Sequence, residues 1–83
     1  MTIEVLFFAV LRERAGRERE TIDLPADATA GQLMDLLVQR HPGFAGIEGR
    51  VQLAVNRQMV PRAHALADGD EVALIPPVSG GAR

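Results

Sequence analysis

A single amphipathic helix is the feature that most restricts the folds open to this chain. Residues 29–40 begin with Thr29-Ala30-Gly31-Gln32. This is the S/T-x-x-E/Q capping box, in which the first and last residues satisfy each other's free backbone amides. An apolar stripe follows at helical spacing, made of Leu33, Leu36 and Leu37 with Met34 and Val38 beside it. One such helix covers only one face of a sheet.

The other periodic segments are predicted to be strands. They are rich in β-branched and apolar residues and comprise residues 2–11, 21–24, 50–56, 58–60 and 71–75. Pro25 ends the second strand, Asn56-Arg57 is a turn between the third and fourth, and Asp68-Gly69 is a turn before the last. The mixed-sign residues 12–20 around Gly16 are interpreted as a solvated hairpin turn rather than an anion or partner patch, because their charges nearly cancel.

Alternation along the strands divides the sheet into two apolar faces. The face toward the helix is expected to contain Ile3, Val5, Phe7, Val51, Leu53, Val55, Val72 and Leu74. The opposite face is expected to contain Leu6, Phe8 and Ile75, with Met59 beside them. An exposed apolar patch on a small domain marks a partner surface, unless loops fold back over it. Both interpretations stay open, and the fold class is α+β with four or five strands.

Composition excludes several functions. The 83 residues correspond to one domain, and none of them is cysteine, which excludes disulfides, thiolate metal sites and cysteine nucleophiles. All nine basic residues are arginine, so lysine chemistry is absent. The net charge of −2 and the three Phe as the only aromatic residues disfavour a nucleic-acid partner. Without a membrane-spanning run or a signal peptide, no membrane partner is expected and the cytoplasm is the default location.

The two histidines are weak catalytic candidates. His41 precedes Pro42-Gly43 at the expected end of the helix, and we expect it to lie beside no other polar cluster. His64 lies in a loop without a partner at metal-ligand spacing. Because these histidines and the acidic residues form no convergent constellation, an independent small-molecule enzyme is disfavoured. No metal site or bound cofactor is expected.

The last segment combines a strand, two prolines and a diglycine. Pro76-Pro77 cannot continue a central strand and should direct the chain off the sheet as a stiff extended segment. Gly80-Gly81 lack Cβ atoms and can pass through a narrow channel. Taken alone, this segment is either a frayed terminus or a tail that reaches into another protein. We predict a domain over residues 1–76 and a flexible tail over residues 77–83.

Three segments resemble the MoaD-type sulfur carriers of the MoaD/ThiS family, the small subunits of molybdopterin synthase. They are Val5-Leu6-Phe7-Phe8-Ala9, Leu53-Ala54-Val55-Asn56 and the most specific one, residues 66–81, which read LADGDEVALIPPVSGG. The resemblance covers essentially the whole chain. It implies a ubiquitin-like β-grasp fold with a mixed sheet and one main helix.

The resemblance also implies a function. In the family an E1-like enzyme uses ATP to adenylate the carboxylate that here belongs to Gly81, after Gly80, and a sulfur donor converts it to a thiocarboxylate. Two such subunits flank a dimer of the large subunit and form a heterotetramer. Their tails donate sulfur to cyclic pyranopterin monophosphate and form the molybdopterin dithiolene. The chain would thus be a sulfur-donor subunit without an active site of its own.

We hypothesise that the apolar patch on the opposite face of the sheet, together with the tail, docks to both partners, the E1-like enzyme and the large subunit. The residues are Leu6, Phe8, Met59, Ile75, Pro76, Pro77, Val78 and Ser79. One departure from the family pattern is that Ala82-Arg83 follow Gly81. An amide at Gly81 cannot be adenylated as an acid. Either a processing protease removes the two residues, or the carrier as written is inactive, or they derive from an expression vector.

Two other interpretations share parts of this pattern. The first is a sulfur carrier for thiamine thiazole, cysteine or transfer-RNA thiolation. The thiamine carriers are generally shorter and lack the Pro-Pro-Val-Ser approach to the diglycine. The second is a ubiquitin-like interaction module whose tail has no role in sulfur transfer.

Overall fold

The computed structural model describes residues 1–77. It contains five strands, two α-helices and two short 3-10 helices in the order β1, α1, β2, α2, η1, η2, β3, β4, β5. Their bounds are β1 Thr2–Phe7, α1 Ala9–Ala15, β2 Arg19–Asp23, α2 Ala30–Arg40, η1 Pro42–Phe44, η2 Glu48–Arg50, β3 Gln52–Val55, β4 Gln58–Val60 and β5 Glu71–Ile75. The predicted residues 71–75 agree with β5 at both ends.

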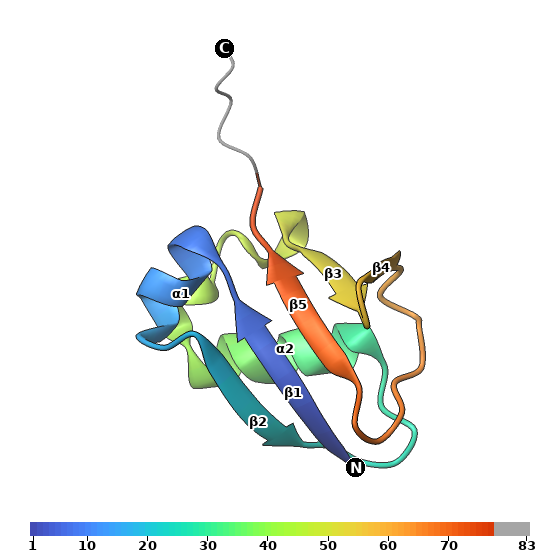
Figure 1. Ribbon diagram of the computed structural model, residues 1–83. Coiled ribbons are helices and arrows are strands. Elements are labelled where there is room, and N and C mark those ends of the chain that lie inside the picture. Colours follow the sequence, from blue (N-terminus) through green and yellow to red (C-terminus); the bar gives the residue numbers. More distant parts are fainter. Residues whose placement is uncertain (78–83) are drawn as a thin grey trace.

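The strands form one five-stranded sheet in the order β2-β1-β5-β3-β4 (Figure 1). β1 and β5 are parallel neighbours at its centre, and every other pair is antiparallel. The first and last strands of the described chain thus lie side by side, and Phe7 and Leu74, near the ends of both, are register partners. A mixed sheet of this order with a helix across one face is the ubiquitin-like β-grasp fold, as the resemblance implied.

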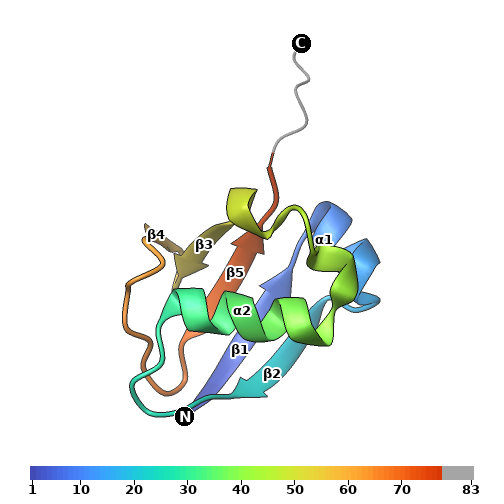
Figure 2. The same ribbon diagram turned by 180° about the vertical axis from the view of Figure 1, so that it is seen from behind.

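The hydrophobic core lies between the sheet and α2, which crosses one face of it (Figure 2). All eight residues predicted to face the helix are buried, none more than 5% exposed. The largest side chains with no exposed surface are Ile3, Leu11, Ile22, Leu33, Leu37, Phe44, Val5, Val72 and Leu74. Within residues 1–77, no helix covers the opposite face of the sheet, which Figure 1 views directly.

The capping box at the start of α2 is confirmed. The Thr29 hydroxyl accepts from the Gln32 backbone N–H at 3.2 Å, and the Gln32 side chain accepts from the Thr29 backbone N–H at 2.9 Å. The apolar stripe was predicted to contain Leu36, with Met34 beside it. In the structure Met34 is 1% exposed, whereas Leu36 is only half-buried. The helix is therefore rotated toward Met34 where it packs on the sheet.

The segment after β1 differs from the prediction. Residues 2–11 are not one strand: β1 ends at Phe7, and residues 9–15 form α1. Residues 12–20 are accordingly not a simple hairpin turn. The run of apolar residues continues from β1 into α1, because α1 also contributes a side chain to the core. That side chain is Leu11, which is fully buried. Gly16, at φ 77°, ends α1 and donates to the Arg12 carbonyl at 2.9 Å.

The segment between α2 and β3 contains the two short 3-10 helices η1 and η2. Phe44 is fully buried and Ile47 half-buried against the core. The Arg14 side chain donates to the Gly43 carbonyl at 2.8 Å and ties α1 to this segment. Within the described chain, no helix is long and apolar enough to cross a membrane.

The β3–β4 turn is confirmed at Asn56-Arg57. Both residues have positive φ, 50° and 73°, as a two-residue type I′ turn requires. Asn56 tolerates this conformation, and its side chain bonds to Asp70 and to the Glu71 N–H. Among the described residues, the Arg57 side chain makes no comparable hydrogen bond. Its Cβ is sterically disfavoured at this positive φ.

We predict that Arg57→Gly stabilises the protein by about 1 kcal/mol, because glycine adopts a left-handed conformation without that cost. Gly69 has φ 85° and no atom within 4 Å of the place where a Cβ would lie, so Gly69→Ala should lower stability by a similar amount through backbone strain alone. Chemical denaturation of both variants measures the two changes. Equal effects of the same sign would contradict this account of the turns.

Candidate functional site

One row of residues crosses the uncovered face of the sheet from edge to edge. Leu6 is the register partner of Arg19 on one side and Ala73 on the other, Ala73 pairs with Ala54, and Ala54 pairs with Met59. The short side chains of Ala73 and Ala54 therefore lie in the middle of the row, between the longer side chains of Leu6 and Met59. Ala54 is only 5% exposed although it lies on the outer face, so its neighbours already cover it.

Two of the exposed apolar side chains of this face lie at the ends of β1 and β5, and a third lies on the edge strand β4, level with Ala73. Among the described residues the large hydrophobic side chains with most exposure are Phe8 at 46%, Met59 at 55% and Ile75 at 38%. Phe8 follows the last residue of β1, and Ile75 is the last residue of β5. Leu6, which belongs to the row described above, is half-buried. We call Leu6, Phe8, Met59 and Ile75 the outer patch.

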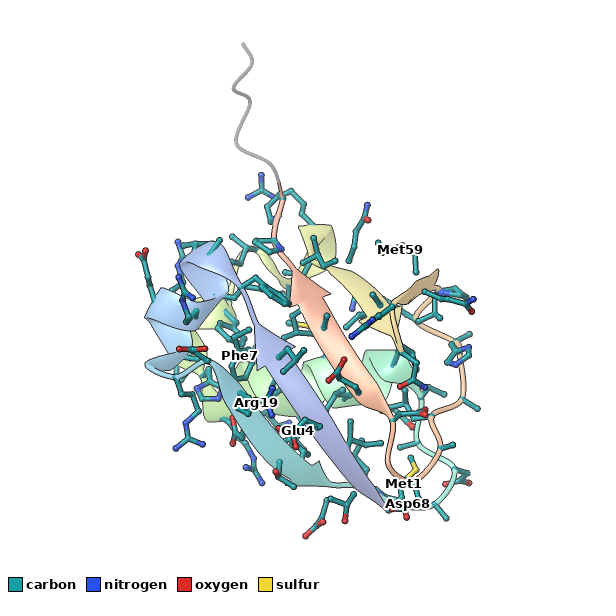
Figure 3. All side chains as sticks on the ribbon, viewed as in Figure 1. Met1, Glu4, Phe7, Arg19, Met59 and Asp68 are labelled. Atoms are coloured by element: carbon teal, nitrogen blue, oxygen red, sulfur yellow. The ribbon has the colours of Figure 1, made fainter. Side chains whose placement is uncertain are left out.

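The other end of the same face is polar. Glu4 and Glu71 are register partners on β1 and β5. Arg19 pairs with Glu4 at 3.3 Å, and Thr21 donates to Glu4 at 3.4 Å. Figure 3 shows Arg19 and Glu4 next to each other on this face, with Met59 on β4. Apolar surface is therefore concentrated at the end where the chain leaves the sheet.

The chain leaves the sheet beside the outer patch. Pro76 and Pro77 follow Ile75 directly and are half-buried. Pro76 and Pro77 lie outside β5, in agreement with the prediction that proline cannot extend a central strand. Val78, Ser79, Gly80 and Gly81 lie outside the described residues, as do Ala82 and Arg83. The placement of the tail boundary at residues 76–77 stays a prediction.

The expectation that His41 lies apart from polar groups is wrong. Its Nε2 lies 2.8 Å from Glu20 Oε1, while Arg40 Nη1 donates to Glu20 Oε2 at 2.8 Å. The imidazole also packs against the rings of Phe44 and Phe7, with centroids 5.1 and 5.6 Å away. The cluster joins the end of α2 to β2. We interpret the role of His41 as structural, because its imidazole contacts Glu20, Phe7 and Phe44.

The charge on Glu20 is stabilised by this cluster. Its side chain is 9% exposed, and burial raises the pKa of Glu20. The hydrogen bonds from His41 and Arg40, with their charges, outweigh burial and hold the pKa below its ordinary value of 4.5. Glu20 therefore contributes stability that is fully present above its unfolded pKa and is lost as the pH falls through the lower folded value.

We predict that Glu20→Gln lowers the free energy of unfolding near neutral pH by about 1–2 kcal/mol, because two charge-assisted hydrogen bonds weaken. The difference from the unmodified protein should shrink as the pH falls below 4.5, where the carboxylate itself is protonated. Urea denaturation between neutral pH and a pH below 4.5 measures this difference in the free energy of unfolding. Glu13→Gln, at an exposed position of α1, is the control and should change little at any pH. A pH-independent effect of Glu20→Gln would contradict the assignment.

Neither of two surface hollows carries a catalytic constellation. One, of about 360 Å³, adjoins Met59 and is lined also by Val51, Val60 and Arg62. The other, of about 420 Å³, lies between α2 and the segment after β2, with Asp23 and Asp27 at its rim. In residues 1–77 no three His, Cys, Asp or Glu side chains are grouped to hold a metal ion. His64 is half-buried in its loop, outside any such group.

The fold and the outer patch define a small ubiquitin-like domain with one open sheet face. The ThiS family pattern matches residues 5–81. A human protein named molybdopterin synthase sulfur carrier subunit is 40% identical over 82 residues, covering 95% of this chain and 93% of that protein. A Mycobacterium tuberculosis protein of the same name is 40% identical over 80 residues, covering 95% of this chain and 96% of its own. The chain belongs to the ThiS family.

Solved structures agree with this assignment. A Pyrococcus furiosus protein assigned as molybdopterin converting factor subunit 1 has a TM-score of 0.87 at 32% identity, covering 94% of this chain and 99% of its own. Small archaeal modifier protein 1 of Haloferax volcanii has a TM-score of 0.85 at 35% identity, covering 98% of this chain and 100% of its own. A chain in a complex of subunits 1 and 2 of the molybdopterin-converting factor of Helicobacter pylori has a TM-score of 0.69 at 28% identity, with 98% and 100% coverage.

Proposed function

We propose that this chain is the sulfur-carrier small subunit of molybdopterin synthase. The observation that carries the proposal is the near full-length similarity to proteins of that name, with the family match extending through Gly81. The structure is consistent with it, because exposed apolar side chains lie where the described chain leaves the sheet. The cytoplasm is the compartment we expect for this role.

The reactive group is the carboxylate of Gly81. A carboxylate is a poor electrophile because its charge is delocalised and oxide is a poor leaving group. An E1-like enzyme overcomes this by letting a carboxylate oxygen attack the α-phosphorus of ATP, with loss of pyrophosphate. Hydrosulfide supplied by the sulfur donor then attacks the acyl carbon, and AMP leaves with the electron pair of the carbon–oxygen bond. The product is a thiocarboxylate, a soft nucleophile that reacts with carbon when held close to it.

The thiocarboxylate then acts in the active site of the large subunit. There it transfers sulfur to cyclic pyranopterin monophosphate, and two such transfers form the dithiolene of molybdopterin. The Helicobacter pylori complex of subunits 1 and 2 supports a large-subunit partner. We place two copies of this chain on a dimer of the large subunit, as a heterotetramer. Any acid or base for the reaction is supplied by that partner.

The position of the outer patch fits this mechanism. Docking through Phe8 and Ile75 would hold the start of the tail against the partner surface, since Pro76-Pro77 follow Ile75 directly. The prolines limit the freedom that is lost when the tail enters a channel. Gly80-Gly81 allow a narrow channel. The polar far end of the face would stay at the rim of the interface.

We predict that Phe8→Asp or Ile75→Asp weakens binding to the large subunit at least about ten-fold, because each buries a charge in an apolar contact. Gln39→Asp is the matched control, because it adds the same charge at an exposed position of α2. Calorimetric titration of the three variants against the large subunit measures the affinities. Equal affinities for all three would remove the outer patch from the interface.

The residues after Gly81 must be removed before activation. Gly81 is followed by Ala82-Arg83 in this sequence, while the family match ends at Gly81. The Gly81 carbonyl is then part of an amide, which lacks the free oxygen that adenylation requires. A peptidase that hydrolyses the bond between Gly81 and Ala82 would release the carboxylate.

We predict that the chain ending at Gly81 gains a thiocarboxylate when incubated with its activating enzyme, ATP and a sulfur donor. The chain ending at Arg83 should stay unchanged under the same conditions. Intact-mass spectrometry detects the exchange of one oxygen for sulfur. A thiocarboxylate on the longer chain, with Ala82-Arg83 still attached, would refute the need for processing.

A second candidate is a carrier or modifier outside molybdopterin synthesis. The similarity to small archaeal modifier protein 1 favours it, with 35% identity over nearly the whole chain. Other sulfur pathways, such as those to thiamine thiazole, cysteine or thiolated transfer RNA, use the same activation chemistry. The acceptor of the sulfur, rather than the formation of the thiocarboxylate, distinguishes these candidates from molybdopterin synthase.

A further inference from the structure

The three methionines of the chain have very different surroundings. Met34 lies on the face of α2 that packs on the sheet and is 1% exposed, and Met1 is half-buried against the same core. Met59 is 55% exposed, the largest exposed fraction of any large hydrophobic side chain in residues 1–77. Figure 3 shows Met59 at β4 and Met1 far from it, at the opposite end of the sheet. Solvent therefore has much better access to Met59 than to the other two.

The position of Met59 in the sheet explains its exposure. β4 is an edge strand, so within the described chain only β3 lies beside it. The register partner of Met59 on β3 is Ala54, whose side chain is too short to cover a thioether. The hollow of about 360 Å³ that Met59 lines lies next to it as well. A small solute can therefore approach Met59 from the outer face of the sheet and from this hollow.

Composition makes methionine the most readily oxidised side chain of this protein, because cysteine, tryptophan and tyrosine are absent from it. In the reaction with hydrogen peroxide, a lone pair of the methionine sulfur attacks one peroxide oxygen and the oxygen–oxygen bond breaks. The second oxygen takes up a proton and leaves as water. The sulfur is oxidised by two electrons to a sulfoxide, and the peroxide is reduced. The product is a polar side chain in place of an apolar one.

We propose that Met59 is a modification site, at which peroxide forms a sulfoxide in the free carrier and thereby weakens docking to the large subunit. The effect on docking rests on the proposed function. Met59 belongs to the outer patch, and the sulfoxide oxygen would lose its bound water when an apolar partner surface covers it. Phe8 and Ile75, the other exposed side chains of the patch, have no sulfur for peroxide to oxidise. Met59 is thus the residue through which a peroxide changes the chemistry of this surface.

The modification is chemically reversible. A dithiol-dependent methionine sulfoxide reductase removes the sulfoxide oxygen as water, while two of its thiols are oxidised to a disulfide. The exposure that admits peroxide to Met59 also gives such an enzyme access to the sulfoxide in the folded protein. Reduction should restore the apolar patch without refolding of the core, because Met34 takes no part in the change.

The first measurement identifies the site in the full chain before activation, when no thiocarboxylate is present to react with peroxide. The protein is treated with hydrogen peroxide, catalase then removes the excess, and peptide mapping by mass spectrometry follows the gain of oxygen at each methionine. Met59 sulfoxide should form at least about ten-fold faster than Met34 sulfoxide, and faster than Met1 sulfoxide. Equal or faster oxidation of Met1 or Met34, in protein that stays folded by circular dichroism, would overturn the assignment of the site.

The second measurement is calorimetric titration of the treated carrier against an untreated large subunit. Oxidation should weaken binding about three- to ten-fold, and a methionine sulfoxide reductase should restore it. Met59→Leu keeps an apolar side chain of similar volume but lacks the sulfur, so peroxide should leave the affinity of this variant as it was before treatment. Met59→Gln, which is polar and uncharged like the sulfoxide, should bind about as weakly as the oxidised protein.

Two results would overturn the effect on docking. One is unchanged affinity of a carrier whose Met59 is fully oxidised. The other is the same loss of affinity in peroxide-treated Met59→Leu, which would place the cause at another residue. Failure of the untreated carrier to bind the large subunit would instead overturn the proposed function. The order of the oxidation rates is measured without the large subunit, so these failures are distinguishable.

Discussion

The parallel pairing of β1 with β5 is the constraint on which the rest of the structure depends. It places β5 at the centre of the sheet, with Val72 and Leu74 buried against the core. The end of β5 is therefore held from both sides, by β1 and by β3. Whatever follows Ile75 starts from a rigid point beside Phe8. A reactive tail gains from such an anchor, because the anchor sets the distance from docking face to reacting atom.

The position of α2 across one face of the sheet determines which face is buried and which stays open. It buries the inner side chains and leaves the outer face of the sheet without a covering helix in residues 1–77, and in the proposed function the large subunit covers that face. The outer face differs in chemistry along its length, since Glu4, Glu71 and Arg19 make one end polar and the outer patch makes the other end apolar. In the proposed function, this difference would direct the large subunit to the end of the sheet where the tail begins. The cluster of Glu20, Arg40 and His41 joins the end of α2 to β2 and stabilises the domain.

The two faces of the sheet and the start of α2 could be predicted from the sequence, because they depend on local periodicity and local capping. Alternation with a period of two assigned Leu6 and Ile75 to one face and Val5 and Leu74 to the other, and the capping box fixed the start of α2. The helix α1 was missed because the run of apolar residues continues from β1 into α1, so hydrophobic periodicity does not mark where the strand ends. The contact between Glu20 and His41 spans 21 residues and depends on tertiary packing. The role of Gly81 came from the family resemblance alone.

The central claim is that the thiocarboxylate of this chain serves molybdopterin synthesis. It is tested most directly by mixing the chain ending in a Gly81 thiocarboxylate with the large subunit and cyclic pyranopterin monophosphate. We expect molybdopterin to form while the thiocarboxylate returns to a carboxylate, with two carrier chains consumed for each dithiolene. A thiocarboxylate that binds the large subunit but persists, with no molybdopterin formed, would contradict the account and direct attention to another acceptor.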